Sequence, residues 1–259
     1  SIIGLGWLGE PLAISLKKQG HSVAGSTTTL AKIDHFRALD LPVVYLKITA
    51  TGIEGSVAPL LKNIDVLVVA IPPKLRGDKK ENYVAKMALL QKEIEQYKVP
   101  KVIFVSSTSV YGDAQGEVTE QIVPKPDTES GKQLWETEQL LTQKNTTIIR
   151  FGGLIGADRN PIKMLSGRAN VAKPNAVVNL IHQEDCIAII SKIIETNTYG
   201  ITLNAVNPSH PSRKAYYFAK AKEYNLPEPL FNENETQLGK QVDSVFSNFY
   251  EGIVFKSLL

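Results

Sequence analysis

The stretch Ile2-Ile3-Gly4-Leu5-Gly6-Trp7-Leu8-Gly9 decides the fold of this 259-residue chain. An apolar strand leads into a G-x-G-x-x-G motif, and a helical segment, 11–19, follows it. The first glycine of such a motif permits a tight turn, the second lets the backbone approach a pyrophosphate, and the third lets helix and strand pack closely. The alternative is a glycine-rich turn without a ligand. We expect a dinucleotide to bind at this loop, and the expected cofactor-binding residues are Gly4, Gly6, Trp7, Leu8 and Gly9.

Alternating apolar and amphipathic segments continue along the chain. The patterns predict strands at 2–3, 22–25, 41–48, 65–70, 101–105 and 146–150, and helices at 11–19, 82–98 and 134–143. Segment 65–70 is continuously apolar after its first residue, which is typical of a parallel strand covered on both faces. The sequence therefore predicts an α/β fold, a Rossmann-type doubly wound parallel sheet with helices on both sides.

The composition changes after about residue 155, where loop-like segments containing proline become frequent. We expect residues 1–155 to form the NAD(P)-binding Rossmann domain, with 178–206 returning to its sheet. Residues 156–177 and 207–259 are then expected to form a smaller C-terminal substrate lobe.

Composition excludes several classes of protein. A hydrophobic fraction of 43% and a charged fraction of 21% are ordinary for a globular chain. The net charge of +3 is small and scattered, so we expect no nucleic-acid partner and no membrane surface. One cysteine, Cys186, and four histidines without ligand spacing predict no metal site. A single cysteine also fits a reducing compartment, so a cytoplasmic location is expected. The run Lys79-Lys80-Glu81 is expected to be a solvated helix start.

The second predicted strand indicates which dinucleotide binds. It runs into Gly25-Ser26-Thr27-Thr28-Thr29, without the acidic residue that holds the ribose of NAD. The hydroxyl groups of Ser26, Thr27 and Thr28, with Lys32 nearby, could hold a 2′-phosphate instead. NADP is therefore favoured, and NAD stays open because no arginine is present; turn and capping chemistry is the alternative role of these hydroxyls. The ends of two later strands are expected to border the cofactor, at Ala70, Ile71, Pro72 and Ser106.

A run of hydroxyl residues, Ser106-Ser107-Thr108-Ser109, follows a buried strand and continues into Val110-Tyr111-Gly112-Asp113. Hydroxyl groups at the carboxyl end of a parallel strand face the ligand crevice, where one can bond a substrate oxygen. A plain strand terminator is the alternative interpretation.

At this point the sequence resembles the extended short-chain dehydrogenase/reductase superfamily, and within it the NAD(P)-dependent epimerase/dehydratase family that includes UDP-galactose epimerase. The resemblance rests on the glycine motif and on segments 106–113, 130–141, 150–156 and 179–185. The G-x-G-x-x-G spacing is similar to that of the atypical, compact branch. The resemblance implies a small-molecule substrate, a nucleotide sugar or related carbonyl compound, and a dimer through helices 82–98 and 134–143.

The family's catalytic set is a Ser/Thr and a Tyr-x-x-x-Lys pair, in which the tyrosine is the general acid/base. Ser107 falls at the Ser/Thr position, but Ser130 stands at the tyrosine position and Leu134 at the lysine position. The catalytic candidates are Ser107, Ser130 and Tyr111, the last as a relocated acid, although the resemblance implies a structural tyrosine at its position. The substrate-binding candidates are Thr108, Arg150, Arg159, His182 and Arg213, since arginine forks bind diphosphates.

Two functions follow from these observations. One is an NAD(P)-dependent epimerase or oxidoreductase, which the glycine, serine and substrate-lobe segments favour. The other is a catalytically silent NAD(P)-binding sensor or partner-binding protein, which the absent Tyr/Lys pair favours.

Overall fold

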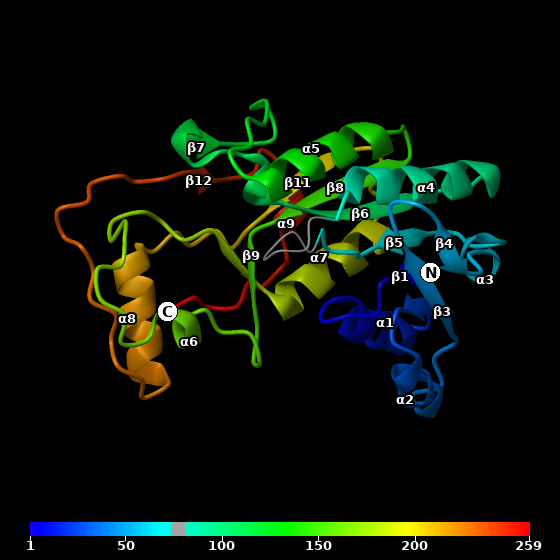
Figure 1. The fold of residues 1–259 in the computed structure, drawn as a ribbon, viewed down its shortest axis with the longest axis horizontal. Coiled ribbons are helices and arrows are strands. Elements are labelled where there is room, and N and C mark those ends of the chain that lie inside the picture. The colour runs from blue at the N-terminus through cyan, green and yellow to red at the C-terminus, as the bar shows by residue number, and fades with distance from the viewer. Residues whose placement is uncertain (74–80) are drawn as a thin grey trace.

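A computed structural model describes residues 1–73 and 81–259 (Figure 1). Its centre is an eight-stranded sheet with the order β11-β8-β6-β5-β1-β2-β3-β4. Neighbouring strands are parallel except for β3 and β4 at one edge. The strands are β1 (Ile2–Ile3), β2 (Gly25–Thr27), β3 (Val43–Ile48), β4 (Ile53–Gly55), β5 (Leu67–Val69), β6 (Val102–Ser107), β8 (Thr146–Phe151) and β11 (Thr202–Ala205). The predicted fold class is confirmed, and the strand order reverses between β1 and β5, where ligands bind in such sheets.

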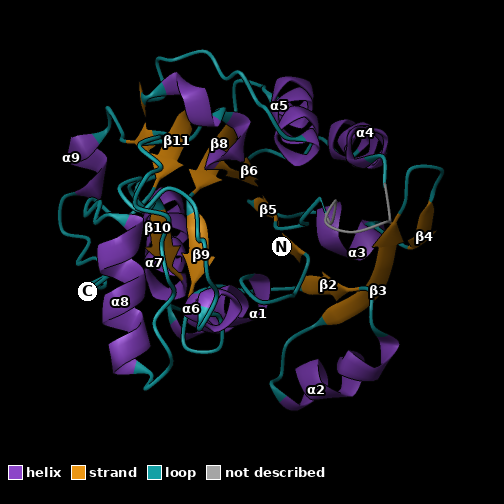
Figure 2. Cartoon of the chain, turned by 60° about the vertical axis from the view of Figure 1, so that its left-hand side comes forward, coloured by secondary structure: helices purple, strands orange, loops and turns teal. Residues whose placement is uncertain are grey.

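Helices cover both faces of the sheet (Figure 2). Helices α4 (Tyr83–Gln96) and α5 (Glu129–Leu141) pack side by side on one face, whereas α1 (Gly9–Lys18) and α7 (Gln183–Glu195) pack together on the other. The α4 residues Met87, Leu90 and Ile94 repeat at three- and four-residue steps and are buried, so this stripe holds the helix on the sheet. Two shorter helices complete the sheet region of the chain: α2 (Ile33–Ala38) precedes β3, and α3 (Ala58–Leu61) precedes β5.

A smaller lobe lies at the left of Figure 1. It contains α6 (Ile162–Leu165), α8 (Arg213–Glu223) and a core of its own around Ile162, Tyr216 and Leu258. Two short parallel pairs accompany it, β9 (Gly153–Ile155) with β10 (Leu180–His182) and β7 (Glu117–Val118) with β12 (Gln241–Val242), and α9 (Ser247–Tyr250) follows. None of the helices in the described ranges has the length and apolar character needed to cross a membrane.

Several element boundaries differ from the sequence prediction, most of all those of the second strand and of α5. The second strand lies at Gly25–Thr27 instead of 22–25, so Ser26 and Thr27 are buried sheet residues and not a turn. Helix α5 begins at Glu129, earlier than the predicted residue 134, because the Thr128 hydroxyl caps it by accepting a hydrogen bond from the Gly131 N–H at 3.1 Å. Lys79 and Lys80 of the predicted helix start lie outside the described residues.

A buried ion pair joins α5 to the sheet. Arg150 on β8 donates from Nη2 to Glu138 Oε2 at 2.6 Å, and the two side chains are only 5% and 0% exposed. Ser106 on β6 donates to Glu138 Oε1 at 2.5 Å. The Tyr111 hydroxyl accepts from Arg150 Nη1 at 2.6 Å and lies 3.1 Å from Asn204 Oδ1 on β11. The Glu138 carboxylate therefore fixes the carboxyl ends of β6 and β8 against the helix that carries Ser130, and Tyr111 extends the network to β11.

We expect Glu138→Gln to lower the free energy of unfolding by about 3–5 kcal/mol, because it leaves the Arg150 guanidinium buried without a counter-charge. Urea denaturation monitored by circular dichroism measures this change. The control is Glu136→Gln on the exposed side of the same helix, with an expected change within about 0.5 kcal/mol. Equal losses in the two variants would contradict the role given to this pair.

Candidate functional site

The glycine loop has no room for a side chain at its two ends, Gly4 and Gly9, but has free space at Gly6 in its middle. Gly4 has a φ of +105°, and a Cβ there would lie 2.8 Å from the Ala70 carbonyl oxygen. A Cβ at Gly9 would lie 2.1 Å from the Gly4 carbonyl oxygen, whereas a Cβ at Gly6 would meet no atom within 4 Å. Side chains are thus excluded where the strand meets the helix, and the backbone at Gly6 faces open space. This is the arrangement that lets a pyrophosphate approach the loop.

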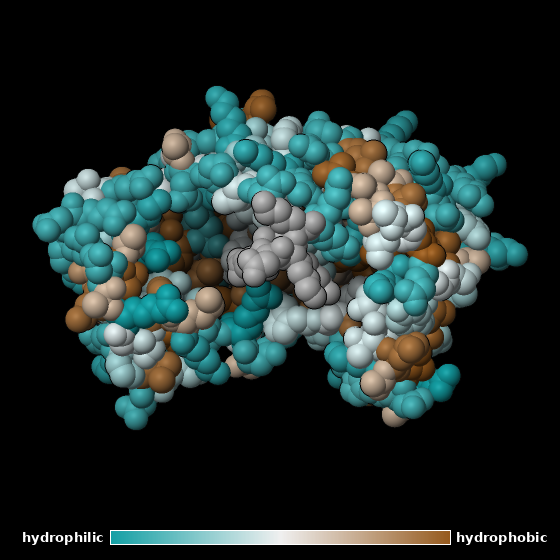
Figure 3. Space-filling view, in the orientation of Figure 1, coloured by the Kyte–Doolittle hydropathy of each residue, from teal (hydrophilic) through white to brown (hydrophobic). Residues whose placement is uncertain are grey.

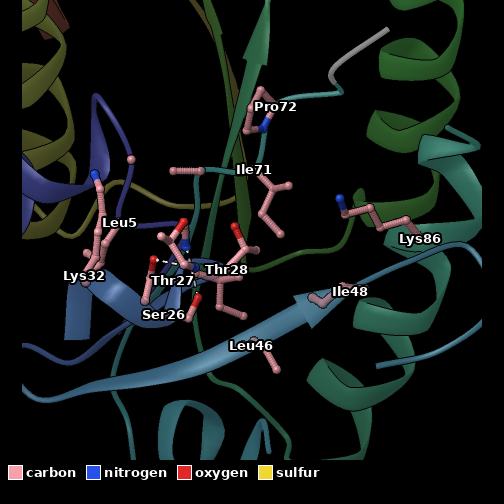
Figure 4. Close-up of a pocket in the computed structure, with 15 residues that line it drawn as sticks. Leu5, Ser26, Thr27, Thr28, Lys32, Leu46, Ile48, Ile71, Pro72 and Lys86 are labelled. Carbon is pink, nitrogen blue, oxygen red and sulfur yellow. Dashed lines mark hydrogen bonds between the residues drawn. The ribbon is translucent and has the colours of Figure 1, made fainter. Parts of the chain in front are cut away.

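A cavity of about 220 Å³ adjoins this loop at the carboxyl ends of β1, β2 and β5 (Figure 4). It brings together nine of the predicted cofactor residues, namely Gly4, Gly6, Ser26, Thr27, Thr28, Lys32, Ala70, Ile71 and Pro72. The structure thus places these residues, from three separate segments, around one space at the topological switch point of the sheet.

Sequence reasoning missed several lining residues, among them Thr29, Leu46 and Ile48 at the end of β3, and Lys86 on α4. Lys86 points from α4 toward the cavity in Figure 4, and its side chain is only 10% exposed. A signal was present in the sequence, because Lys86 lies next to Met87 and three residues after Tyr83 on the buried stripe of α4. A charged residue on such a stripe indicates a functional or paired group.

Hydroxyl and ammonium groups make up the polar lining. The Ser26 hydroxyl accepts from the Gly4 N–H at 3.1 Å, so it anchors the loop, and the Thr27 hydroxyl accepts from the Thr29 N–H at 3.1 Å. Thr28 is exposed, and Lys32 has only a 4.0 Å contact with Glu10. Lys86 Nζ lies 3.3 Å from Glu81 Oε1. Thr28 and Lys32 therefore retain the capacity to bind phosphate oxygens, whereas Lys86 is paired with the Glu81 carboxylate.

Trp7 and Leu8, also predicted at the cofactor, do not line this cavity. Leu8 is buried in the core. The Trp7 indole N–H donates to Asp158 Oδ1 at 2.7 Å, and the Arg159 guanidinium lies 5.1 Å from the ring centroid. Gln183 on α7 donates to the Trp7 carbonyl oxygen at 2.5 Å. Trp7 therefore connects the glycine loop to the segment that enters the smaller lobe.

Two of the catalytic candidates lie at adjoining parts of the fold. Ser107 ends β6, and its hydroxyl accepts from the Ser109 N–H at 3.1 Å. Gly131, the neighbour of Ser130, packs so closely that a Cβ there would lie 2.2 Å from the Ser109 carbonyl oxygen. Ser107 and Ser130 are both half-buried. The start of α5 thus lies against the serine-rich segment.

The structure places three other candidates differently from the prediction. Ser106, Tyr111 and Arg150 were expected at the crevice, but they belong to the buried network around Glu138. Burial raises the pKa of the Tyr111 hydroxyl above its ordinary value, although Arg150 and Asn204 act in the opposite direction. These side chains satisfy one another's hydrogen-bonding groups inside the core, so the geometry favours a structural role for them.

The substrate candidates are divided among several places. Arg159 and His182 line a second cavity, of about 240 Å³, together with Tyr216 of α8. His182 also caps α7 by accepting from the Glu184 N–H at 3.3 Å. Thr108 is buried. Arg213 lies at the start of α8, with its guanidinium 5.6 Å from the Tyr217 ring centroid. In the part of the chain that the structure describes, no group of three or more acidic, histidine or cysteine side chains could hold a metal ion.

Comparison with known proteins places the chain in a family. It is 34% identical to protein YeeZ of Escherichia coli strain K12 over 248 residues, which are 94% of this chain and 90% of the relative. The chain belongs to the family of protein YeeZ. Residues 1–123 match the family model described as the NAD binding domain of 6-phosphogluconate dehydrogenase. This match covers the glycine loop and the strands that surround the first cavity.

Solved structures show the same fold. A functionally unknown conserved protein from Silicibacter pomeroyi has a TM-score of 0.77 at 21% identity, over 100% of this chain and 93% of that chain. The UDP-glucuronic acid 4-epimerase from Bacillus cereus, solved in complex with NAD, has a TM-score of 0.75 at 20% identity, over 99% and 93%. The fold implied by the family resemblance is therefore confirmed.

The loop geometry predicts that two alanine substitutions differ in their effect on stability. Gly9→Ala forces a methyl group against the Gly4 carbonyl, so we expect the free energy of unfolding to fall by about 2 kcal/mol or more. Gly6→Ala adds a methyl group to open space, and we expect a change within about 0.5 kcal/mol. Thermal and urea denaturation of both variants measure the difference. A stable Gly9→Ala protein, or a strongly destabilised Gly6→Ala protein, would contradict the described loop.

Proposed function

We propose that this protein is an NADP-dependent oxidoreductase or epimerase that acts on a nucleotide sugar or a related carbonyl compound. The observation that carries the proposal is the open backbone at Gly6 beside a cavity lined by Thr28, Lys32 and Lys86. A dinucleotide needs a close backbone approach for its pyrophosphate and polar groups for its ribose, and this site offers both. The match of residues 1–123 to an NAD binding domain supports the same cofactor class.

Each part of the cavity suits one part of the cofactor. The backbone at Gly6 and the start of α1 would hold the pyrophosphate. Thr28, Thr29 and Lys32 follow β2 and would hold the 2′-phosphate of the adenosine ribose, while the apolar wall of Leu46, Ile48 and Ile71 would take the adenine ring. The bound nicotinamide would supply hydride chemistry. NAD is the alternative cofactor, since Thr28 and Thr29 could equally bond a free ribose hydroxyl.

Ser107 and Ser130 are the proposed substrate-contacting hydroxyls. Each could donate a hydrogen bond that polarises a carbonyl oxygen, but an unassisted serine hydroxyl is a much weaker acid than a tyrosine, whose pKa is about 10. The UDP-glucuronic acid 4-epimerase from Bacillus cereus supports a nucleotide sugar as the substrate, through its likeness in fold. A homodimer through α4 and α5 and a cytoplasmic location stay predictions.

A catalytically silent NAD(P)-binding protein is the second candidate function. It is supported by Leu134, which is 3% exposed and packs in the core at the position where the family resemblance implies a lysine. A screen of NADPH consumption and of UDP-sugar epimerisation with the purified protein separates the two functions. If the unmodified protein turns over substrate faster than a double variant with Ser107→Ala and Ser130→Ala, the protein is an enzyme. If it binds the cofactor without turnover, the sensor function is supported.

Gly6→Ala should weaken NADPH binding by about tenfold or more, because the added methyl group occupies the space where the pyrophosphate would approach. Calorimetric titration measures the affinity. Gly52→Ala is the matched control, since a Cβ at Gly52 also meets no atom within 4 Å and Gly52 does not line the cavity. Unchanged NADPH affinity in Gly6→Ala would remove the glycine loop from the proposed site.

Lys32→Gln should weaken NADPH binding by about tenfold and NADH binding by about twofold or less, because only NADPH carries the 2′-phosphate. Fluorescence titration of both cofactors gives the two ratios. Lys17→Gln serves as the control, since Lys17 pairs with Asp40 and does not line the cavity. If Lys32→Gln weakens NADH and NADPH equally, Lys32 does not contact the 2′-phosphate.

A further inference from the structure

Trp7 belongs to the glycine loop through its backbone and contacts the entry of the smaller lobe through its side chain. The indole N–H donates to Asp158 Oδ1 at 2.7 Å, and the Arg159 guanidinium lies 5.1 Å from the ring centroid. Gly156 leaves room for the ring, because a Cβ there would lie 2.9 Å from Trp7 Cζ2. Gly156 and Arg159 bond each other's backbone at 3.1 and 3.0 Å, so the indole packs on a closed turn.

A glutamine of α7 holds the main chain of the same residue. Gln183 is the first residue of α7 and is half-buried, and its Nε2 donates to the Trp7 carbonyl oxygen at 2.5 Å. In a planar trans peptide the carbonyl group and the N–H group of one unit point in opposite directions. The Leu8 N–H belongs to the same peptide unit as the Trp7 carbonyl, so the bond from Gln183 turns this N–H away from α7.

The Leu8 N–H lies at the start of α1. Leu8 is the N-cap residue of this helix, and its apolar side chain cannot cap it. Among the residues that the structure describes, neither the Trp7 N–H nor the Leu8 N–H donates a hydrogen bond, whereas the Glu10 N–H donates to the Gly6 carbonyl oxygen at 3.0 Å. Free N–H groups at a helix N-terminus bind anionic groups such as a pyrophosphate. The orientation of the peptide between Trp7 and Leu8 therefore affects how tightly a dinucleotide binds.

The packing of α1 on α7 has other sources than this bond. Leu12 and Leu16 of α1 share a buried apolar cluster with Ile189 of α7. A second glutamine bond joins the two helices at the far end of α1, where Gln19 Nε2 donates to Ser191 Oγ at 3.3 Å. The bond to the Trp7 carbonyl oxygen is therefore the contact of α7 that acts on the glycine loop, and the helix pair has its own support elsewhere.

We propose that Gln183 is a positioning residue for the dinucleotide, which holds the Trp7 carbonyl oxygen so that the Leu8 N–H faces the pyrophosphate. The inference rests on the proposed function and adds a residue that does not line the dinucleotide cavity. On the face drawn in Figure 3 the molecule is hollowed between its two lobes, and the Trp7 indole connects the glycine loop to the smaller lobe through Asp158. The loop is thus held by α7 at a carbonyl oxygen and by the smaller lobe at a side chain, which preorganises its N–H groups.

Gln183→Leu removes the donor and keeps the approximate size of the side chain. We expect calorimetry to show NADPH and NADH bound about tenfold more weakly, and by the same factor, because both carry the pyrophosphate. Adenosine 2′-monophosphate has no pyrophosphate, so its affinity should change by about twofold or less. Gln19→Leu is the matched control, since it removes the other glutamine bond between α1 and α7 and should change each affinity by about twofold or less.

The outcomes separate this inference from the proposed function. Thermal unfolding checks that each variant folds, and Gln183→Glu, which places an acceptor against the Trp7 carbonyl oxygen, keeps the test decisive if Gln183→Leu does not fold. Weaker binding of both dinucleotides with unchanged binding of adenosine 2′-monophosphate supports the positioning role. Unchanged NADPH affinity, an equal loss in Gln19→Leu, or a parallel loss for adenosine 2′-monophosphate overturns it, even when the unmodified protein binds NADPH normally. If the unmodified protein binds neither NADPH nor NADH, the proposed function itself is overturned.

Discussion

The carbonyl oxygen of Gly4 occupies the place where a side chain of residue 9 would stand, and this contact governs how α1 meets β1. The Gly4 backbone turns with a positive φ against Ala70 of the neighbouring strand, and Gly9 starts the helix directly behind it. Of the three motif glycines, Gly6 is the one with open space around an added Cβ. The position of the open backbone at Gly6, the cavity beside it and the orientation of the helix N-terminus all depend on this absence of side chains.

A second constraint organises the other half of the site. Glu138 binds Arg150 and Ser106, and Arg150 in turn binds Tyr111, so the ends of β6 and β8 and the residue that follows the turn Thr108–Val110 form one bonded unit with α5. Pairs of this kind add little net stability compared with apolar packing, but breaking one is costly. The network therefore fixes the relative placement of the segments that carry Ser107 and Ser130.

The fold could be predicted from sequence because its signals are local. The glycine motif, the apolar run at 65–70 and the periodicity of α4 each specify an element without reference to distant residues. Sequence patterns identified residues of the cavity lining that follow strand ends, such as Ala70 and Thr28. They did not show that Ser106, Tyr111 and Arg150 are buried, since that burial depends on contacts with Glu138 and Asn204, which come from other elements. Lys86 was missed because a helix residue reaches the cavity only through tertiary packing.

The most direct test of the cofactor assignment is a calorimetric titration of the unmodified protein with NADPH and, in parallel, with NADH. The proposed function predicts one NADPH per chain, bound about tenfold more tightly than NADH because of the 2′-phosphate contacts expected from Thr28 and Lys32. Absence of binding by either cofactor, in a protein that is folded by circular dichroism, would contradict the assignment of the glycine loop and its cavity as a dinucleotide site.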